Sequence, residues 1–386
     1  MPAHVPVLFF LCCLPLLVRA QETEEPPKVT LNGYVKDLFS LNHQPLLNDW
    51  LVDNVVHNRL SFRYFPAEGL TVALEARNRL FYGQTVENFA FYPEFIEQDP
   101  GIVDLSCNWL QGDNWFVHTI ADRAFVDYTS GKWQIRAGRQ RINWGRALVW
   151  NPNDVFNAYS FFDFDYEERP GSDAVLARYY TGATSSAELA VAAGDSLQAS
   201  TVAGMFRFNK WYYDFQVLAG KVRDDLVLGA GWSGQIGGAA FRGEMTWLQP
   251  FRNRQALDPA FVAVLSADYT FPSSLYLQSE VIYNSAASAE SANFFDLTQQ
   301  LTVRNLNLVK FSIFGSLACQ FTPLWRASLG GIWNPGDRSA FLSPSVDVSL
   351  SDNFGLLLIG QVFLGAGGSL FGQAGSLFFT RLKWSF

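Results

Sequence analysis

The sequence is poor in charge, in histidine and cysteine, and in long hydrophobic runs. Only 17% of its 386 residues are charged, and the formal net charge is −8. A nucleic-acid-binding protein normally carries a basic face, so this acidic balance argues against that class. Hydrophobic residues make up 49% of the chain, which excludes intrinsic disorder. Behind residue 20 no apolar run reaches the roughly 20 residues of a transmembrane helix.

Residues that carry catalysis or bind metals are scarce as well. The chain has four histidines and four cysteines, and none of them shows HExxH or CxxC spacing. The sequence also lacks GxSxG and the phosphate-binding GxxxxGK[ST] motif. We therefore expect no catalytic residues, no metal site and no cofactor, and we expect that the protein is not an enzyme.

The N-terminus indicates export. An apolar run from Val7 to Val18 is too short to span a bilayer and is followed by a small residue, Ala20. Val18 and Ala20 lie at −3 and −1 of a cleavage site, which is typical of a secretory signal peptide. We expect a signal peptide at 1–20, a short periplasmic segment at 21–28, and a single domain at 29–386.

The mature chain alternates between apolar and polar residues. In the segment 70–80, Val72 and Leu74 fall on one face, while Glu75 and Arg77 fall on the other. Two is the period of a β-strand, and one wholly apolar face per strand means that this face is buried or covered by lipid. The pattern recurs from Val29 to the end of the chain.

About 18 such strands are predicted, several of them with the length of a tilted membrane-spanning strand. They cover 29–39, 55–65, 70–82, 115–129, 132–142, 173–181, 186–193, 200–208, 211–222, 226–236, 239–249, 260–270, 275–283, 307–321, 324–333, 340–350, 354–364 and 376–386. The number falls to 16 if the weak segments 186–193 and 200–208 are misread. The expected fold class is all-β.

The connections alternate in length. Short links such as Ser130-Gly131 and Gly237-Gly238 are separated mostly by longer links, among them 40–54, 83–114 and 284–306. Tight turns at one end and long loops at the other describe a transmembrane, antiparallel up-and-down β-barrel. A soluble two-sheet sandwich has no reason to separate its loops by length, and it is far shorter.

Aromatic residues near the strand ends agree with a membrane barrel, because such barrels carry aromatic girdles at both interfaces. Trp247, Trp333 and Trp384 are examples. The ending Leu382-Lys383-Trp384-Ser385-Phe386 resembles the C-terminal strand of Gram-negative outer-membrane proteins. That resemblance implies a location in the cell outer membrane, contact with its lipid, and insertion by the barrel-assembly machinery.

A barrel of this size leaves an aqueous lumen unless something fills it. The inward faces are rich in arginine, and these charges would line the pore and order polar solutes. They could instead pair with acidic residues on neighbouring strands. The candidate pore-lining residues are Arg59, Arg63, Glu75, Arg77, Arg79, Arg136 and Arg178.

The link 143–172 is the most distinctive stretch, because glycine and proline punctuate it. Its place between the fifth and sixth strands resembles that of the loop that folds into the barrel of general porins. The sequence GRQxxNWG…NPxD, which begins at Gly138, also resembles a motif of porin-like barrels and, more weakly, of the alginate-exporter group. The resemblance implies an in-folded loop whose constriction residues are Asp154, Asp163, Asp165, Glu167, Glu168 and Arg169.

The sequence therefore predicts an outer-membrane, porin-like channel for passive diffusion of small polar or anionic solutes. Two alternatives stay open: a dedicated exporter or importer of an acidic polysaccharide, and a non-conducting barrel that anchors surface partners. No nucleic-acid partner is expected. The identity of the solute and a homo-oligomeric state are not fixed by the sequence.

Overall fold

The computed structural model describes residues 27–44, 49–99, 101–165, 169, 171–196, 198–251, 257–287 and 301–386. The expected signal peptide at 1–20 lies outside the described residues, as do most of the segment 21–28 and the loop residues Glu167 and Glu168.

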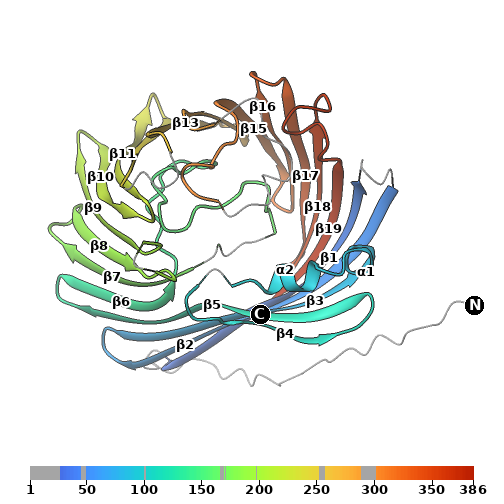
Figure 1. Ribbon diagram of the computed structural model, residues 1–386, viewed down its shortest axis with the longest axis horizontal. Coiled ribbons are helices and arrows are strands. Elements are labelled where there is room, and N and C mark those ends of the chain that lie inside the picture. The colour runs from blue at the N-terminus through green and yellow to red at the C-terminus, as the bar shows by residue number, and fades with distance from the viewer. Residues whose placement is uncertain are drawn as a thin grey trace, which may run out of the picture.

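Eighteen antiparallel strands form one closed barrel (Figure 1). Each strand pairs with its neighbours in the chain, and β1 pairs with β19 to close the ring. An additional short strand, β4, pairs with β5. The expected all-β barrel is therefore confirmed, and the presence of both β8 and β9 decides for 18 strands over 16.

The first half of the barrel is made of β1 Val29–Gln44, β2 Asp49–Ala67, β3 Leu70–Gly83, β5 Trp115–Ser130, β6 Trp133–Gln140, β7 Ser172–Tyr180, β8 Ser186–Ala192, β9 Thr201–Lys210 and β10 Tyr213–Val222. The second half is made of β11 Asp225–Ile236, β12 Ala239–Pro250, β13 Ala260–Thr270, β14 Leu275–Asn284, β15 Phe311–Thr322, β16 Trp325–Asn334, β17 Ser339–Ser351, β18 Phe354–Leu364 and β19 Ser376–Ser385. The link between β3 and β5 carries α1 Gln84–Asn88, α2 Tyr92–Glu97 and β4 Ser106–Gln111.

Three predicted strand boundaries are wrong by four residues or more. The long link expected at 40–54 does not exist, because β1 and β2 stay paired as far as Gln44 and Asp49. The strand expected from residue 307 begins at Phe311. There the Asn307 side chain donates 2.6 Å to the carbonyl of Val309 and 2.9 Å to Ser312 Oγ, so the chain bends before it joins the ladder.

One turn was placed two residues too early. The sequence predicted a turn at Asn209-Lys210, but Trp211 and Tyr212 form it, with φ of 56° and 63°. In the resulting ladder Phe208 pairs with Phe215. Moving a two-residue turn by two positions changes no side chain's face, because the side-chain period is two. Alternation alone therefore cannot choose between the two turns.

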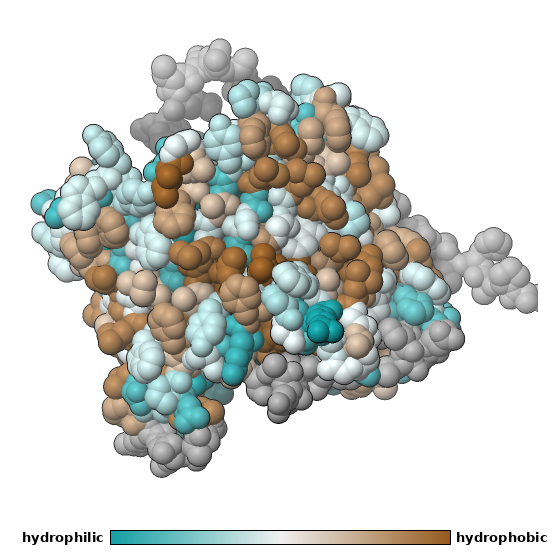
Figure 2. All heavy atoms as spheres, turned by 90° about the horizontal axis from the view of Figure 1, so that it is seen from above, coloured by the Kyte–Doolittle hydropathy of each residue, from teal (hydrophilic) through white to brown (hydrophobic). Residues whose placement is uncertain are grey.

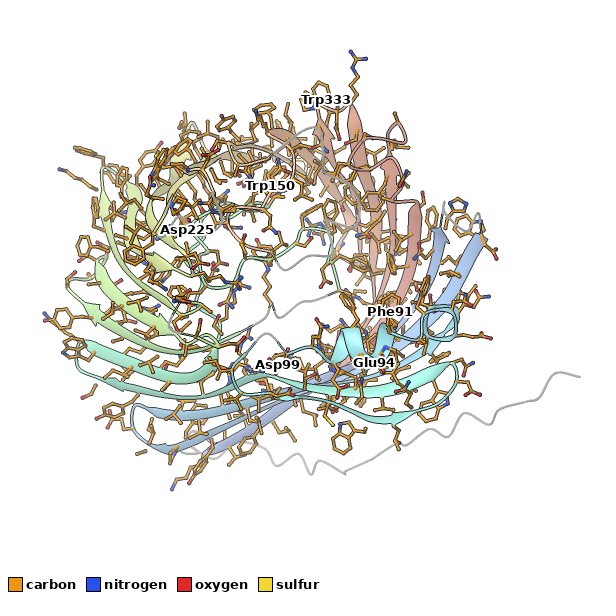
Figure 3. The ribbon with its side chains drawn as sticks, viewed as in Figure 1. Phe91, Glu94, Asp99, Trp150, Asp225 and Trp333 are labelled. Carbon is orange, nitrogen blue, oxygen red and sulfur yellow. The ribbon has the colours of Figure 1, made fainter. Side chains whose placement is uncertain are left out.

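The outer wall is mostly apolar. Figure 2 shows hydrophobic side chains spread over one side of the barrel, and Trp333 points away from it in Figure 3. Leu329 is 47% exposed on this outer face, whereas its neighbour Ser328 faces the interior and hydrogen-bonds Ser345. No helix among the described residues is long and apolar enough to cross a membrane.

Opposite faces of one strand should respond differently to the same charge. Leu329→Arg places a guanidinium against lipid, at a cost of about 2–4 kcal/mol near the bilayer midplane. Ser328→Arg places it in the lumen, where water hydrates it. We expect Leu329→Arg to lower the fraction of heat-modifiable, folded protein after refolding into lipid vesicles, and Ser328→Arg to leave it near wild type. Equal refolding of both variants would contradict an outer wall in contact with lipid.

Candidate functional site

The link between β6 and β7, which includes residues 141–165, lies inside the barrel (Figure 1). Trp150, from this link, lies within the ring in Figure 3. This inserted loop contacts the inner wall on strands from both halves of the barrel.

Two buried glutamates hold the first part of the inserted loop. Glu244 on β12 accepts hydrogen bonds from the backbone N–H groups of Arg146, of Ala147 at 2.6 Å and of Asn153 at 3.0 Å. Both its side chain and that of Glu280 are almost fully buried. A buried carboxylate has to be hydrogen-bonded, and here backbone N–H groups of the loop fill that need.

Glu280 on β14 does the same for the next residues of the loop. It accepts from the N–H groups of Leu148 at 3.0 Å, Val149 at 3.2 Å and Trp150 at 2.6 Å. Together the two glutamates receive six backbone N–H groups from residues 146–153. The two glutamates therefore fix the path of the loop backbone and not the positions of the loop side chains.

An aromatic contact holds the middle of the loop against β15 and β17. The ring centroids of Phe161 and Phe314 are 5.0 Å apart, as are those of Phe162 and Phe341. Gln361 on β18 adds a polar contact by donating 2.8 Å to the carbonyl of Phe162. Edge-to-face aromatic pairs stabilise by about 0.5–1.5 kcal/mol beyond the area that they bury.

An ion pair holds the far end of the loop against β1. Asp165 Oδ1 lies 2.7 Å from Lys36 Nζ, and its Oδ2 lies 3.2 Å from His57 Nε2. Arg381 on β19 is 3.7 Å away. Of the expected constriction residues, Asp165 therefore faces basic wall residues, although Lys36 was not among the candidates that the sequence named.

Two of the expected constriction residues, Asp154 and Arg169, lie in different surroundings. Asp154 has almost no exposed surface, and Arg141 lies 3.5 Å from its Oδ2. Burial raises the pKa of the Asp154 carboxyl to about 7, against the opposing charge of Arg141. Arg169 instead lies over the ring of Tyr159.

Arginines of the wall are mostly paired with acidic residues. Arg59 is buried, with its Nη2 at 2.8 Å from Glu75 and its Nη1 at 2.5 Å from Asp122; Arg77 is 3.8 Å from Asp122. Arg79 contacts His118 Nδ1 at 3.0 Å. The four candidates Arg59, Glu75, Arg77 and Arg79 thus lie in one polar network of β2, β3 and β5.

Asp122 escaped the sequence analysis because it sits at a β-bulge. The pairing of β3 with β5 shifts there: Glu75 faces Arg123, and Ala76 faces Ala121. An extra residue breaks the alternation, so both Asp122 and Arg123 are buried. Strict alternation from Asp127 would have turned Asp122 outward. The sequence did carry one signal of the bulge: the two charged residues Asp122 and Arg123 are adjacent within a predicted strand.

The remaining candidates lie nearer the end with short turns, which we call the turn end. Arg136 pairs with Asp127 at 2.5 Å, and Arg178 with Glu188 at 2.9 Å. Arg63 reaches Glu75 only at 3.4 Å, and 52% of its side chain is exposed. These pairs join adjacent strands, as cross-strand neighbours commonly do.

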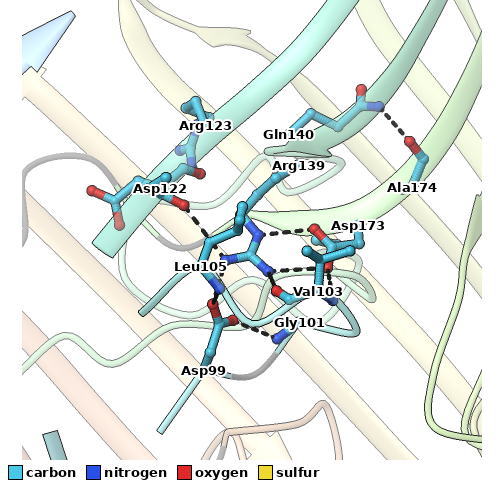
Figure 4. A network of polar contacts seen from close by, with 12 residues as sticks. Asp99, Gly101, Val103, Leu105, Asp122, Arg123, Arg139, Gln140, Asp173 and Ala174 are labelled. Carbon is cyan, nitrogen blue, oxygen red and sulfur yellow. Dashed lines mark hydrogen bonds and ion pairs between the residues drawn. The ribbon is translucent and has the colours of Figure 1, made fainter. Parts of the chain in front are cut away.

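A further arginine clamps a second loop to the wall (Figure 4). Arg139 on β6 lies 2.6 Å from Asp99, 2.8 Å from Asp173, and donates 2.6 Å to the carbonyl of Val103. It therefore joins the link between β3 and β5 to the start of β7. Arg139 is the arginine of the GRQxxNWG motif, and the sequence did not predict this structural role.

A cavity of about 1480 Å³ lies between the inserted loop and the wall. Loop residues on one side include Phe156, Asp163 and Arg169. The wall of β14–β18 supplies hydroxyl and amide groups on the other: Gln278, Ser316, Ser328, Ser343, Ser345 and Gln361. Of the constriction candidates that the structure describes, Asp163 and Arg169 line it, and none of the seven wall candidates does.

The cavity reaches the end with long loops, which we call the loop end, because its lining includes Asp195, Asp224 and Leu257. Ser328 and Ser345 lie deeper, with their Oγ atoms 2.6 Å apart. Among the described residues no group of three or more His, Cys, Asp and Glu side chains could hold a metal ion.

Comparisons with known proteins identify the fold. No family model matches the chain, and no curated protein matches it by sequence. Solved structures do: OccAB4 of Acinetobacter baumannii has a TM-score of 0.60 at 9% identity, over 93% of this chain and 98% of that one. The outer membrane protein OprD from Pseudomonas aeruginosa has a TM-score of 0.60 at 8% identity, over 93% of each chain. The expected porin-like barrel fold is thereby confirmed.

Removing one anchor should loosen the inserted loop. Glu280→Ala leaves the N–H groups of Leu148, Val149 and Trp150 without their acceptor, and an unpaired buried donor costs about 1–3 kcal/mol. We expect larger and noisier single-channel currents than in wild type. Asp347→Ala is the matched control, because it removes an exposed wall carboxylate that faces Arg326 in the ladder, away from the loop. Equal currents in both variants would contradict the anchoring role.

The packing around Asp154 should depend on pH. Its pKa of about 7 exceeds the ordinary 3.8, so the folded loop binds the proton more tightly than the unfolded chain does. Stability is then highest at acid pH and falls as the pH rises toward 7, by about 1.4 kcal/mol per unit of pKa shift. We expect a lower unfolding midpoint at pH 8 than at pH 5, and a smaller difference in Asp154→Asn. An unchanged difference in that variant would contradict the assignment.

Proposed function

We propose that this protein is a porin-like channel of the outer membrane of a Gram-negative bacterium, through which small polar or anionic solutes diffuse passively. The closed barrel and its apolar outer face suit a lipid bilayer, which only helices and closed barrels span. The fold is shared with a protein described as an outer membrane protein. In this reading the turn end is periplasmic and the loop end is outside.

The cavity beside the inserted loop carries the proposal. It begins among loop-end residues such as Asp224 and extends along the wall to Gln278 and Ser345. Its hydroxyl and amide groups can exchange hydrogen bonds with a polar solute as that solute sheds water. The loop is held beside this cavity through its bonds to Glu244 and Glu280. A solute would therefore pass between the loop and the wall of β14–β18.

Charge supports a preference for anions at two places, one in the cavity and one outside it. Arg169 lines the cavity, and Arg63 is half-exposed nearer the turn end. Arg59, Arg77 and Arg79 are held in the wall by acidic and histidine partners. We propose that Arg169 and Arg63 meet the solute, whereas Arg59, Arg77 and Arg79 set the electrostatic field of the wall. The acidic Asp163 on the loop lines the same cavity and would exclude large anions from its side.

The partners follow from this location. Outer-membrane lipid would cover the apolar wall, and the barrel-assembly machinery would insert the chain through its C-terminal strand. Trp384 and Phe386 lie exposed on that strand's outer face and at its end. The mixed charge of the cavity favours a small solute over the acidic polysaccharide of the alternative reading, because a long polyanion would meet Asp163, Asp195 and Asp224 in succession.

Single-channel recording of the mature chain in a planar bilayer tests this function. We expect current steps that scale with salt concentration. Ser345→Trp fills the path and should reduce the conductance by at least half, whereas Leu342→Trp adds the same ring to the lipid face and should not. A folded barrel without conductance would favour the surface-anchor reading. Block by a long acidic oligosaccharide, but not by small anions, would favour the polysaccharide transporter.

A further inference from the structure

One sector of the outer wall is polar where the rest of the wall is apolar. Asn58 on β2, Asn78 on β3, Thr119 on β5 and Cys107 on β4 are consecutive partners in the ladder. They therefore form a single row around the barrel, which we call the polar row. On β7–β16 the outward mid-strand positions are apolar or glycine, with Ser279 and Cys319 as the exceptions among the described residues.

The polar row faces outward. The alternate residues on the same strands, such as Arg59 and Arg77, point inward and form the buried ion network of the wall. The outward neighbours of the row include Leu60 and Leu74, which are exposed. The row thus lies on the face that lipid covers elsewhere.

Hydrogen bonds within the polar row use only part of its capacity. Thr119 Oγ1 donates 2.7 Å to Asn78 Oδ1, Asn78 Nδ2 donates 3.2 Å to Asn58 Oδ1, and Asn58 Nδ2 contacts the carbonyl of Tyr34 at 3.5 Å. An amide carries two N–H donors, and these contacts occupy one on each asparagine. Each asparagine therefore keeps a donor that can serve a partner.

Next to the row lies a carboxylate. Asp37 on β1 is exposed and pairs in the ladder with Val56 and Leu382, both outward residues. It forms no hydrogen bond or ion pair with any residue that the structure describes. Two strand positions away, Phe39 faces Asn54, whose Oδ1 is buried without a hydrogen-bond partner.

Aromatic residues bracket Asp37 along the barrel axis. Trp384, which pairs with Val35, lies toward the turn end. Trp50 and Phe378, with ring centroids 6.1 Å apart, lie toward the loop end. Aromatic girdles mark the two interfaces of a membrane barrel, so Asp37 lies within the apolar band. A carboxylate there is unfavourable against lipid and needs donors.

A second copy of this chain would supply such donors. The same sector carries an acceptor-only carboxylate on β1 and amides with spare N–H groups on β2 and β3, so it is complementary to itself. We propose that this sector of β1, β2 and β3 is a contact surface between two copies, in which Asn58 or Asn78 of one copy donates to Asp37 of the other. The inference goes beyond the proposed channel function and rests only on the location of the barrel in a membrane.

The mass of the refolded chain in lipid nanodiscs and in mild detergent tests the proposal. We expect the wild type to assemble, with at least two copies per particle. Asp37→Leu combined with Asn58→Leu replaces the polar contacts with side chains suited to lipid, and we expect single copies. Ser279→Leu makes the same kind of change on the outward face of β14 and should leave the assembly intact.

Heat-modifiability and single-channel current, measured on the same samples, separate this inference from the channel function. A wild-type chain that folds, conducts and stays single in both media would overturn the contact surface but not the channel. An assembly that persists in the double leucine variant would also overturn it, because the contact would then lie elsewhere. Asn78→Leu is the second variant, and partial loss of assembly is expected from it.

Discussion

Two buried carboxylates determine how the lumen is used. Glu244 and Glu280 face inward on β12 and β14, where a carboxylate without hydrogen-bond donors would be costly. The inserted loop supplies six backbone N–H groups, and in return its path is fixed inside the barrel. The aromatic contact of Phe161 and the ion pair of Asp165 then hold the loop further round the wall. The position of the cavity follows from this arrangement.

The many arginines of the wall suggest a lumen lined with free charges, but most of them form ion pairs. Most arginines pair with an acid on a neighbouring strand, and Arg59 is buried between two carboxylates. Where the cavity meets β14–β18, its polar groups are hydroxyls and amides, from Ser316 to Gln361, and they lie beside apolar residues such as Phe314 and Ile359. Most of the fixed charges stabilise the barrel and the loop, whereas in the proposed channel the solute would meet these hydrogen-bonding groups together with Arg169. In the proposed channel such a path would bind a solute loosely enough to release it, as conduction requires.

The sequence predicted the fold well because apolar and polar residues alternate along every strand. A register slip of one residue would move every side chain of that strand to the opposite face, so the pattern reveals it. It predicted the site less well, since contacts across the lumen join residues far apart in the chain. Asp165 and Lys36 are an example, at a separation of 129 residues. Asp122 was missed because a bulge reverses its face. The turn at Trp211 was misplaced because both choices leave every side chain on the same face.

The central claim is that the inserted loop lies in the lumen and shapes the path of the solute. Ser160 of that loop lines the cavity, so a thiol placed there should be reached by a charged reagent from the water-filled path. In a background of Cys107→Ser and Cys319→Ser, reaction of Ser160→Cys with an anionic methanethiosulfonate should reduce the single-channel current of an open channel. Full labelling with no change in current would place the loop away from the path and contradict the account.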